Sequence, residues 1–279
     1  MNESLLAFRG FLYLKVTVGL GVVVLALYMA DTPLGGVPNG GTWLGYALGT
    51  VAALLILWLF WFGVRKRHYG VGRMPLVGWL SAHVYFGSLL LLIGTLHTGF
   101  HFGWNVHTLA YALMVVVIFS GMFGTYAYLR YPSLMTANRS GMTLDQLIAA
   151  IGTIDAQCRE AALPLPDDIN RLLVSACDNV IVGTLWQRLS GRVRGCSTEF
   201  ALATLSGSGT SGTGRSMQEM EGVRSLVGLL SRKADLLRRA RADIRFKALL
   251  EIWLYLHVPL SVALLAALIA HVVSVFYFW

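Results

Sequence analysis

Five long apolar runs, separated by polar segments, dominate the pattern of hydrophobic and polar residues along this chain. The runs lie at 11–29, 43–64, 77–100, 108–128 and 249–278. Each is close to or beyond the roughly 20 residues that a helix needs to cross the hydrocarbon core of a bilayer. Of all the Lys and Arg residues, only Lys15 falls inside a run. The pattern therefore predicts five transmembrane helices.

The first run also has a length that suits a secretory signal peptide. Its charge is sparse, however, and the residues at 30–33, Ala-Asp-Thr-Pro, make a poor cleavage site. We therefore expect a retained helix. The connections between the first four runs are short, which is typical of an antiparallel bundle.

The polar segment at 131–247 has the features of a helical insertion. Pro132 is expected to end the fourth transmembrane helix, because proline disfavours helix continuation. Thr143 and Gln146 have the spacing of a capping box, which predicts a helix from there to about residue 162. A break at 163–168 then leads into a second helix through Cys177.

Residues 206–216 are rich in Gly and Ser and are expected to form a flexible linker. Their glycines also satisfy the G-x-G-x-x-G pattern of nucleotide-binding loops. That motif needs a preceding strand and a parallel sheet, and the segment lacks strand-like runs. From Ser216 an Arg-rich amphipathic pattern predicts a long helix that runs straight into the fifth transmembrane helix.

The predicted fold is thus an all-α membrane protein: a five-transmembrane-helix bundle with a helical cytoplasmic insertion between helices 4 and 5. The expected domains are residues 1–130 with helices 1–4, residues 131–247 with the insertion, and residues 248–279 with helix 5.

The charge distribution predicts the orientation. Of 22 Lys and Arg residues, 16 lie in 130–247 and four lie in the loop after the second run, whereas the connections at 30–42 and 101–107 have none. By the positive-inside rule, the N-terminus and the insertion are cytoplasmic and the C-terminus is periplasmic. The net charge of +8 then reflects topology and contact with anionic lipid, and it does not imply nucleic-acid binding. Because no organelle signal is visible, we expect a bacterial inner membrane.

The three cysteines form no CxxC or CxxCH pattern. The sequence therefore suggests no covalently attached haem, iron–sulfur cluster or zinc site, and reduced thiols are expected.

Four histidines in the apolar runs form two pairs with equal spacing. His83 and His97 are 14 residues apart in the third run, and His257 and His271 are 14 residues apart in the fifth. On a straight helix this spacing places both rings on nearly the same face, about 21 Å apart along the axis. The third and fifth helices run parallel, since one helix separates them. We therefore expect His83 to lie level with His257 on the inner side, and His97 level with His271 on the outer side.

These pairs suit the binding of two haems. An imidazole is costly inside a membrane unless it is paired, hydrated or bound. A single such residue is as easily explained by a hydrogen bond between helices, but two matched pairs favour a cofactor. Two neutral imidazoles per iron give a six-coordinate, electron-transferring b-type haem. Non-haem iron or copper would be expected to bring carboxylate or sulfur ligands as well.

Two further histidines are alternates. His101 lies one turn beyond His97 and competes with it as the outer ligand. His107 opens the fourth helix, where a haem propionate, a quinone head-group or water are all possible neighbours. Gly87, Gly94, Gly121 and Gly124 are expected to give room for haem or to serve ordinary helix packing. Trp253, with other tryptophans near helix ends, is expected in an interfacial belt.

With His83, His97, His257 and His271 in this arrangement, the chain resembles the dihaem membrane cytochrome b superfamily. It is most similar to the ferric-reductase-like transmembrane core, where helices 3 and 5 each bring two histidines separated by 13 or 14 residues. The resemblance covers the five helices, about 130 residues. Cytochrome b of the quinol–cytochrome c reductases is a more distant analogue, with its pairs on helices 2 and 4. Ferric reductases and NADPH oxidases add a C-terminal FAD and NAD(P)H domain, which is not expected here, and the insertion is no part of the usual core. Electrons are therefore expected to enter and leave through other subunits or quinone.

Three functions follow as hypotheses. In the first, the protein is an electron-transfer subunit of a membrane oxidoreductase complex. It connects a quinone or cytoplasmic donor with a periplasmic partner such as a c-type cytochrome, and flavoprotein or iron–sulfur subunits are further candidate partners. In the second, it is a transmembrane reductase of ferric chelates or a small acceptor, fed by a separate flavoprotein. In the third, it is a non-redox membrane scaffold or sensor whose histidines pack.

Overall fold

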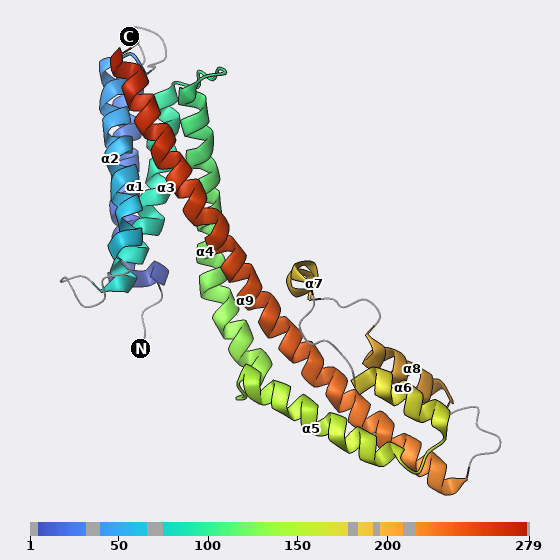
Figure 1. Cartoon of the computed structure of the whole chain (residues 1–279). Coiled ribbons are helices and arrows are strands. Elements are labelled where there is room, and N and C mark those ends of the chain that lie inside the picture. Colours follow the sequence, from blue (N-terminus) through green and yellow to red (C-terminus); the bar gives the residue numbers. More distant parts are fainter. Residues whose placement is uncertain are drawn as a thin grey trace. The chain divides into compact units, whose positions relative to one another are not determined.

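The computed structural model describes residues 5–31, 40–65, 75–177, 184–191, 196–208 and 216–277. Within these ranges the chain forms helices and no strand, which confirms the predicted all-α class (Figure 1). The elements are the 3-10 helix η1 (Leu5–Ala7) and the α-helices α1 (Phe8–Asp31), α2 (Trp43–Arg65), α3 (Leu76–Thr98), α4 (Val106–Arg139), α5 (Leu144–Ala162), α6 (Asp167–Cys177), α7 (Leu185–Ser190), α8 (Ser197–Ser208) and α9 (Met217–Tyr277).

The helices form two compact units. The membrane unit comprises Met1–Tyr126 and Trp253–Trp279, and the insertion unit comprises Ala127–Ile252. Both α4 and α9 contribute to both units, so the division falls inside continuous helices. The predicted domain boundaries at residues 130 and 247 stay predictions.

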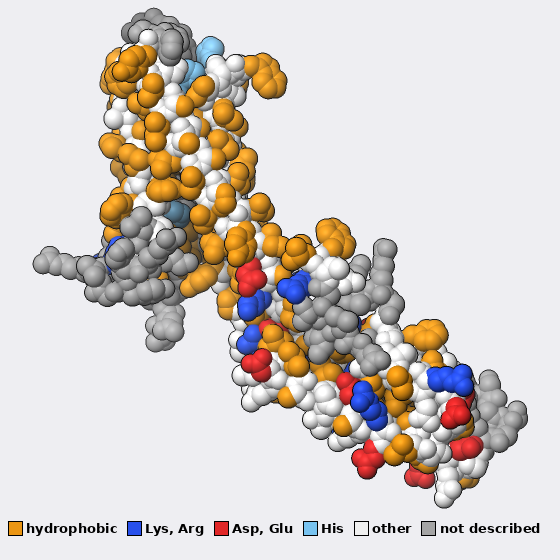
Figure 2. All heavy atoms as spheres, in the orientation of Figure 1, with side chains coloured by type: hydrophobic (Ala, Val, Ile, Leu, Met, Phe, Trp, Pro, Cys, Tyr) orange, Lys and Arg blue, Asp and Glu red, His pale blue; other side chains and the backbone are white. Residues whose placement is uncertain are grey.

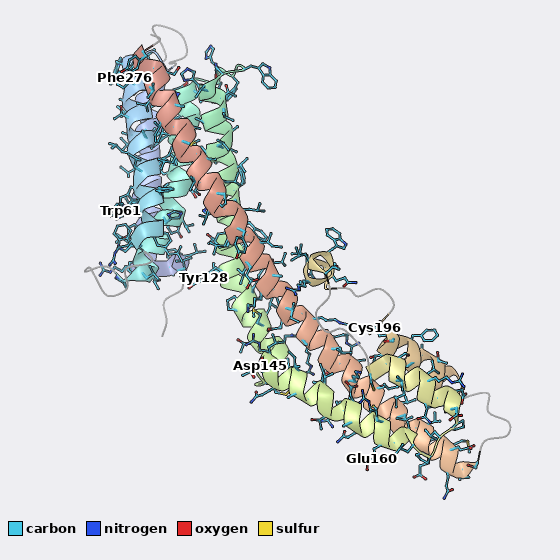
Figure 3. All side chains as sticks on the ribbon, viewed as in Figure 1. Trp61, Tyr128, Asp145, Glu160, Cys196 and Phe276 are labelled. Atoms are coloured by element: carbon cyan, nitrogen blue, oxygen red, sulfur yellow. The ribbon has the colours of Figure 1, made fainter. Side chains whose placement is uncertain are left out.

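Five of the described helices, α1, α2, α3, α4 and α9, are long and apolar enough to cross a membrane. This confirms the predicted multi-pass membrane protein. Hydrophobic side chains cover the visible face of the membrane unit, whereas Lys, Arg, Asp and Glu gather over the insertion unit (Figure 2). Trp61 and Phe276 are exposed on the membrane unit, as suits contact with lipid, and Asp145 and Glu160 are exposed on the insertion unit (Figure 3).

The core of the membrane unit draws on all five of these helices. It includes Tyr28 of α1, Leu48 of α2, Ile93 of α3, Ile118 of α4 and Leu264 of α9. Helix α3 packs against both α1 and α2. More buried residues lie on α3 than on any other helix of this unit, and its two histidines, His83 and His97, are part-buried.

Helix α4 does not end at Pro132, which corrects the prediction. Pro132 lies inside α4, which continues to Arg139. The last turn of α4 is fastened to α9: Arg139 pairs with the buried Asp243 at 2.6 and 2.8 Å, and the side chain of Asn138 donates to the Arg239 carbonyl at 2.7 Å. An interior proline costs a helix about 3 kcal/mol. These contacts, which local sequence does not reveal, offset that cost.

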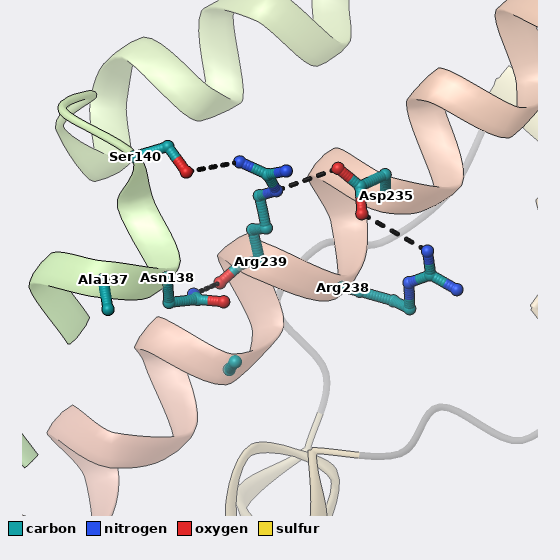
Figure 4. A pocket seen from close by; sticks show the side chains of 7 residues that line it. Ala137, Asn138, Ser140, Asp235, Arg238 and Arg239 are labelled. Atoms are coloured by element: carbon teal, nitrogen blue, oxygen red, sulfur yellow. Dashed lines mark hydrogen bonds and ion pairs between the residues drawn. The ribbon is translucent and has the colours of Figure 1, made fainter. Parts of the chain in front are cut away.

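The same junction holds a shallow hollow of about 450 Å³ between the end of α4 and α9 (Figure 4). The guanidinium of Arg239 donates to Ser140 Oγ at 2.8 Å and pairs with Asp235 at 2.8 Å. Asp235 also pairs with Arg238. Asp235 is thus shared by both arginines, which leaves one net positive charge at the hollow, and the hollow belongs to the packing of α4 on α9.

The predicted start of α5 is confirmed by its capping box. The backbone N–H of Gln146 donates to Thr143 Oγ1 at 3.2 Å, and the backbone N–H of Thr143 donates to Gln146 Oε1 at 2.8 Å. Helix α5 then runs to Ala162, and α6 ends at Cys177, both as predicted.

Helix α9 confirms the predicted run from the insertion into the fifth span. It is continuous over 61 residues, with Pro259 inside it. The predicted linker begins too early at residue 206, because α8 continues to Ser208; residues 209–215 of it lie outside the described residues.

A buried lysine stands in the core of the insertion unit. Around it, Leu147 of α5, Leu173 of α6 and Leu230 of α9 belong to one apolar cluster. Lys233 is fully buried; its Nζ lies 2.5 Å from Asp155 Oδ1 and donates to the Ala176 carbonyl at 2.6 Å. This lysine therefore has both a counter-charge and a backbone acceptor.

Candidate functional site

The four histidines of the membrane spans come from α3 and α9. His97 and His271, called pair A below, have ring centres 6.1 Å apart and ring planes at 88°. His83 and His257, called pair B, lie near enough for electrostatic interaction between the two imidazoles. The structure therefore brings together the same partners that the parallel direction of the two helices predicted.

In pair A, helix α2 fixes the ring of His97. The Nδ1–H of His97 donates to the Gly45 carbonyl at 2.8 Å. The ring fits against Gly49, where an added Cβ would come within 2.6 Å of the His97 ring carbon Cε1. A carbonyl oxygen has two lone pairs, so Gly45 can accept both this bond and the helical N–H of Gly49. The missing side chain at Gly49 lets the ring reach the carbonyl.

The other ring of pair A, His271, is held by His107 in the first turn of α4. Their Nδ1 atoms are 2.5 Å apart, and their ring centres are 4.5 Å apart with perpendicular planes. One ring must donate and the other accept. Of the two predicted alternates, His107 is therefore in the site. His101 lies beyond the end of α3, is exposed, and its Nδ1 faces the Gly99 carbonyl at 2.8 Å.

Pair B has a different set of partners. Nδ1 of His257 lies 3.2 Å from Ser120 Oγ on α4. His83 packs on Phe62 of α2, with ring centres 5.0 Å apart, and meets the backbone carbonyl of Leu59. Its Nδ1 is buried and has no hydrogen-bond partner among the described residues.

Trp253 packs beside His257, and its expected place in an interfacial belt stays a prediction. Its Nε1–H donates to the Ser120 carbonyl at 2.8 Å, and its ring centre is 5.5 Å from that of His257. The indole occupies the space that a side chain at Gly124 would take. The hydrogen bond to the Ser120 carbonyl turns the indole toward α4.

The four glycines expected near a cofactor have different neighbours. Gly94 faces Met114, and Gly124 faces Trp253, so both serve helix packing. An added Cβ at Gly121 would lie 3.5 Å from His257 Cε1, and one at Gly87 would meet nothing within 4 Å. The presence of room for haem at these positions stays a prediction.

The residues of pair A fit a haem iron. Among the described residues no cluster of three or more His, Cys, Asp or Glu is arranged to hold a metal ion, but haem iron takes only two axial ligands from protein. A metal–nitrogen bond of about 2 Å on each side separates two imidazole centres by about 6 Å, close to the value in pair A. Hydrogen bonds use Nδ1 of His97, His257 and His271, which leaves Nε2 of each; in His83 the atom without a partner is Nδ1. Imidazole coordinates metals through either nitrogen.

The three cysteines belong to the insertion unit, and all are free thiols. Burial, with Cys177 and Asp155 nearby, raises the pKa of the Cys158 thiol to about 11. For Cys196 burial acts in the same direction, but hydrogen bonds from the backbone of Glu199 and from Arg241 outweigh it and lower the pKa.

Comparisons of the chain with protein-family models, with curated proteins and with solved structures found no match. The site is therefore interpreted from its own residues.

Sequence reasoning missed the groups that orient the rings. Gly45 and Gly49 form a G-x-x-x-G pattern in an apolar run, which signals close approach to a neighbouring helix, and this signal was available. Ser120 gave no signal, because a serine in a transmembrane helix commonly bonds back to its own helix.

Proposed function

We propose that the protein is a b-type dihaem cytochrome subunit, of the dihaem membrane cytochrome b superfamily, that moves electrons across a bacterial inner membrane. The donor would be a quinone or a cytoplasmic protein, and the acceptor a periplasmic redox partner such as a c-type cytochrome. The observation that carries the proposal is pair A: two part-buried imidazoles 6.1 Å apart, each with its Nδ1 already bonded.

His97 and His271 would hold one haem, and His83 and His257 the other. When bound, haem supplies a one-electron Fe(III)/Fe(II) couple. The chain's own part is to bind and orient. Gly45 and His107 fix the rings of pair A, and the rings of both pairs are part-buried. The ligand levels are about 21 Å apart along α3, which lets two haems together span much of a hydrocarbon core of about 30 Å.

The proposed orientation has pair B near the cytoplasmic side and pair A near the periplasmic side, with the N-terminus inside. The excess of Lys and Arg in 130–247 supports it. The insertion unit, helical and basic, would then face the cytoplasm, where it can dock a donor protein.

The test is to purify the full chain in detergent and to measure haem per chain with the reduced-minus-oxidised spectrum. We expect two low-spin b haems in the wild-type protein and one in each of His257→Ala and His271→Ala. His101→Ala is the matched control, because its exposed ring lies outside both pairs, and it should keep two.

Wild-type protein without a b-haem spectrum would contradict the proposal and favour a membrane scaffold or sensor. Full haem content in both His257→Ala and His271→Ala would contradict the assigned ligands.

A further inference from the structure

Helix α4 meets both histidines of α9, and it does so with matched spacing. His107 and Ser120 are 13 residues apart on α4, and His271 and His257 are 14 residues apart on α9. The contacts are His107 Nδ1 to His271 Nδ1 at 2.5 Å and Ser120 Oγ to His257 Nδ1 at 3.2 Å. Since α4 and α9 run in opposite directions through the membrane unit, the near-equal spacings keep both contacts level.

We infer that His107 and Ser120 are positioning residues for the two α9 ligands and that they set the two haems at different potentials. This inference rests on the proposed function. A histidine that binds a metal through Nε2 carries its proton on Nδ1 and donates it to a neighbouring acceptor, which fixes the ring and makes it a stronger ligand. His107 Nδ1 would be that acceptor for His271, and Ser120 Oγ for His257.

The two acceptors differ in chemistry. An sp² imidazole nitrogen is a stronger acceptor than an aliphatic hydroxyl, and the contact to His107 is also the shorter. A more strongly donating axial ligand stabilises Fe(III) and lowers the reduction potential. His107 thus lowers the potential at pair A by more than Ser120 lowers it at pair B.

Both acceptors are themselves fixed. Trp253 of α9 donates to the carbonyl of Ser120 and packs on Gly124, which locks the level of α4 against α9. His107 sits in the first turn of α4, close to His97 as well as His271. Neither residue needs to touch a haem to act, since each works through a ligand.

The experiment is a redox titration of both haems, with EPR of the ferric protein, in His107→Ala, His107→Asn, Ser120→Ala and Ser120→Thr. We expect His107→Ala to keep two haems and to favour reduction at pair A by about tenfold. That factor is about 59 mV for one electron. His107→Asn places an amide oxygen near the position of Nδ1 and should restore most of the wild-type potential.

Ser120→Ala should raise the reduction potential of the haem at pair B alone, and by less than His107→Ala raises that of the haem at pair A. Ser120→Thr, which keeps the hydroxyl, should leave the potential unchanged. If the wild-type protein binds two haems, and their potentials and EPR signals are unchanged in all four variants, this inference is wrong while the proposed function stands. Loss of a haem in His107→Ala but not in His271→Ala would overturn it too, since His107 would then be the ligand. A wild-type protein without b haem would overturn both the inference and the proposed function.

Discussion

Lys233 in the insertion unit and His83 in the membrane unit both bury a basic nitrogen, but their surroundings differ. Nζ of Lys233 has the Asp155 carboxylate and the Ala176 carbonyl, whereas Nδ1 of His83 has no partner among the described residues. A buried polar atom left unpaired costs about 1–3 kcal/mol. Native structures keep few such atoms, and each asks for an explanation. The comparison sets a buried ammonium that has a counter-charge beside a buried imidazole nitrogen for which the described residues supply no hydrogen bond.

The largest expected effect is on the paired group. Asp155→Ala leaves the Lys233 ammonium buried without its counter-charge, which should cost about 3–5 kcal/mol. Thermal unfolding and limited proteolysis of the full chain in detergent measure the loss. Replacing both partners, Asp155→Leu with Lys233→Met, should recover most of it, because apolar pairs of similar size are often as stable. A single variant as stable as wild type would mean that Asp155 does not hold Lys233.

Replacing His83, whose Nδ1 is unpaired among the described residues, should raise the free energy of unfolding, whereas replacing Asp155 should lower it. In protein from haem-depleted cells, His83→Leu removes an unsatisfied atom and should raise the free energy of unfolding by about 1–3 kcal/mol. In haem-replete cells the same variant should lose one of two haems. If the haem-free variant is instead less stable, His83 has a structural partner and the comparison with Lys233 fails.

A smaller effect separates pair A from pair B. An added Cβ at Gly49 would come within 2.6 Å of the His97 ring, whereas one at Gly121 would lie at an ordinary 3.5 Å from His257. Gly49→Ala should therefore displace His97, cost about 1–2 kcal/mol and weaken the haem of pair A. Gly121→Ala should leave pair B intact. Haem content and the EPR signal of each haem measure both, and equal effects would refute the assigned contacts.

The effect that is smallest near neutral pH is a pH dependence near Lys233. The pKa of Cys158 is raised to about 11 by burial, while an unfolded cysteine titrates near about 8.5. The folded state therefore keeps a proton that the unfolded chain releases. The contribution to stability is fully present below about pH 8.5 and is lost as the pH rises toward 11. Cys158→Ala should flatten this fall in the thermal unfolding midpoint, and an unchanged slope would contradict the assignment.

Much of the fold was predictable because its signals are local. The apolar runs predicted the five spans, Thr143 and Gln146 predicted the start of α5, and the amphipathic pattern after Ser216 predicted a continuous α9. Each rests on hydrophobic periodicity or on capping within a few residues. The predicted end of α4 at Pro132 was wrong because the Arg139–Asp243 pair, between residues far apart in sequence, outweighs the cost of a proline inside the helix.

For the candidate site, the sequence predicted which histidines lie opposite each other, but it did not predict the hydrogen bonds of their rings. Equal spacing and parallel helices placed His97 opposite His271. Which nitrogen each ring keeps, however, depends on contacts between helices, such as the His107 contact to His271. Trp253 illustrates the same limit, since its direction depends on a carbonyl of another helix.

The hydrogen bond from His97 to the Gly45 carbonyl has a consequence for how this site can change during evolution. The acceptor is a main-chain atom, so no exchange of the amino acid at position 45 removes it. What mutation can remove is the empty space at Gly49, where every other residue brings a Cβ into the ring. Substitution of Gly45 therefore leaves the acceptor of His97 in place, whereas substitution of Gly49, one helical turn away, disturbs the orientation of the ring.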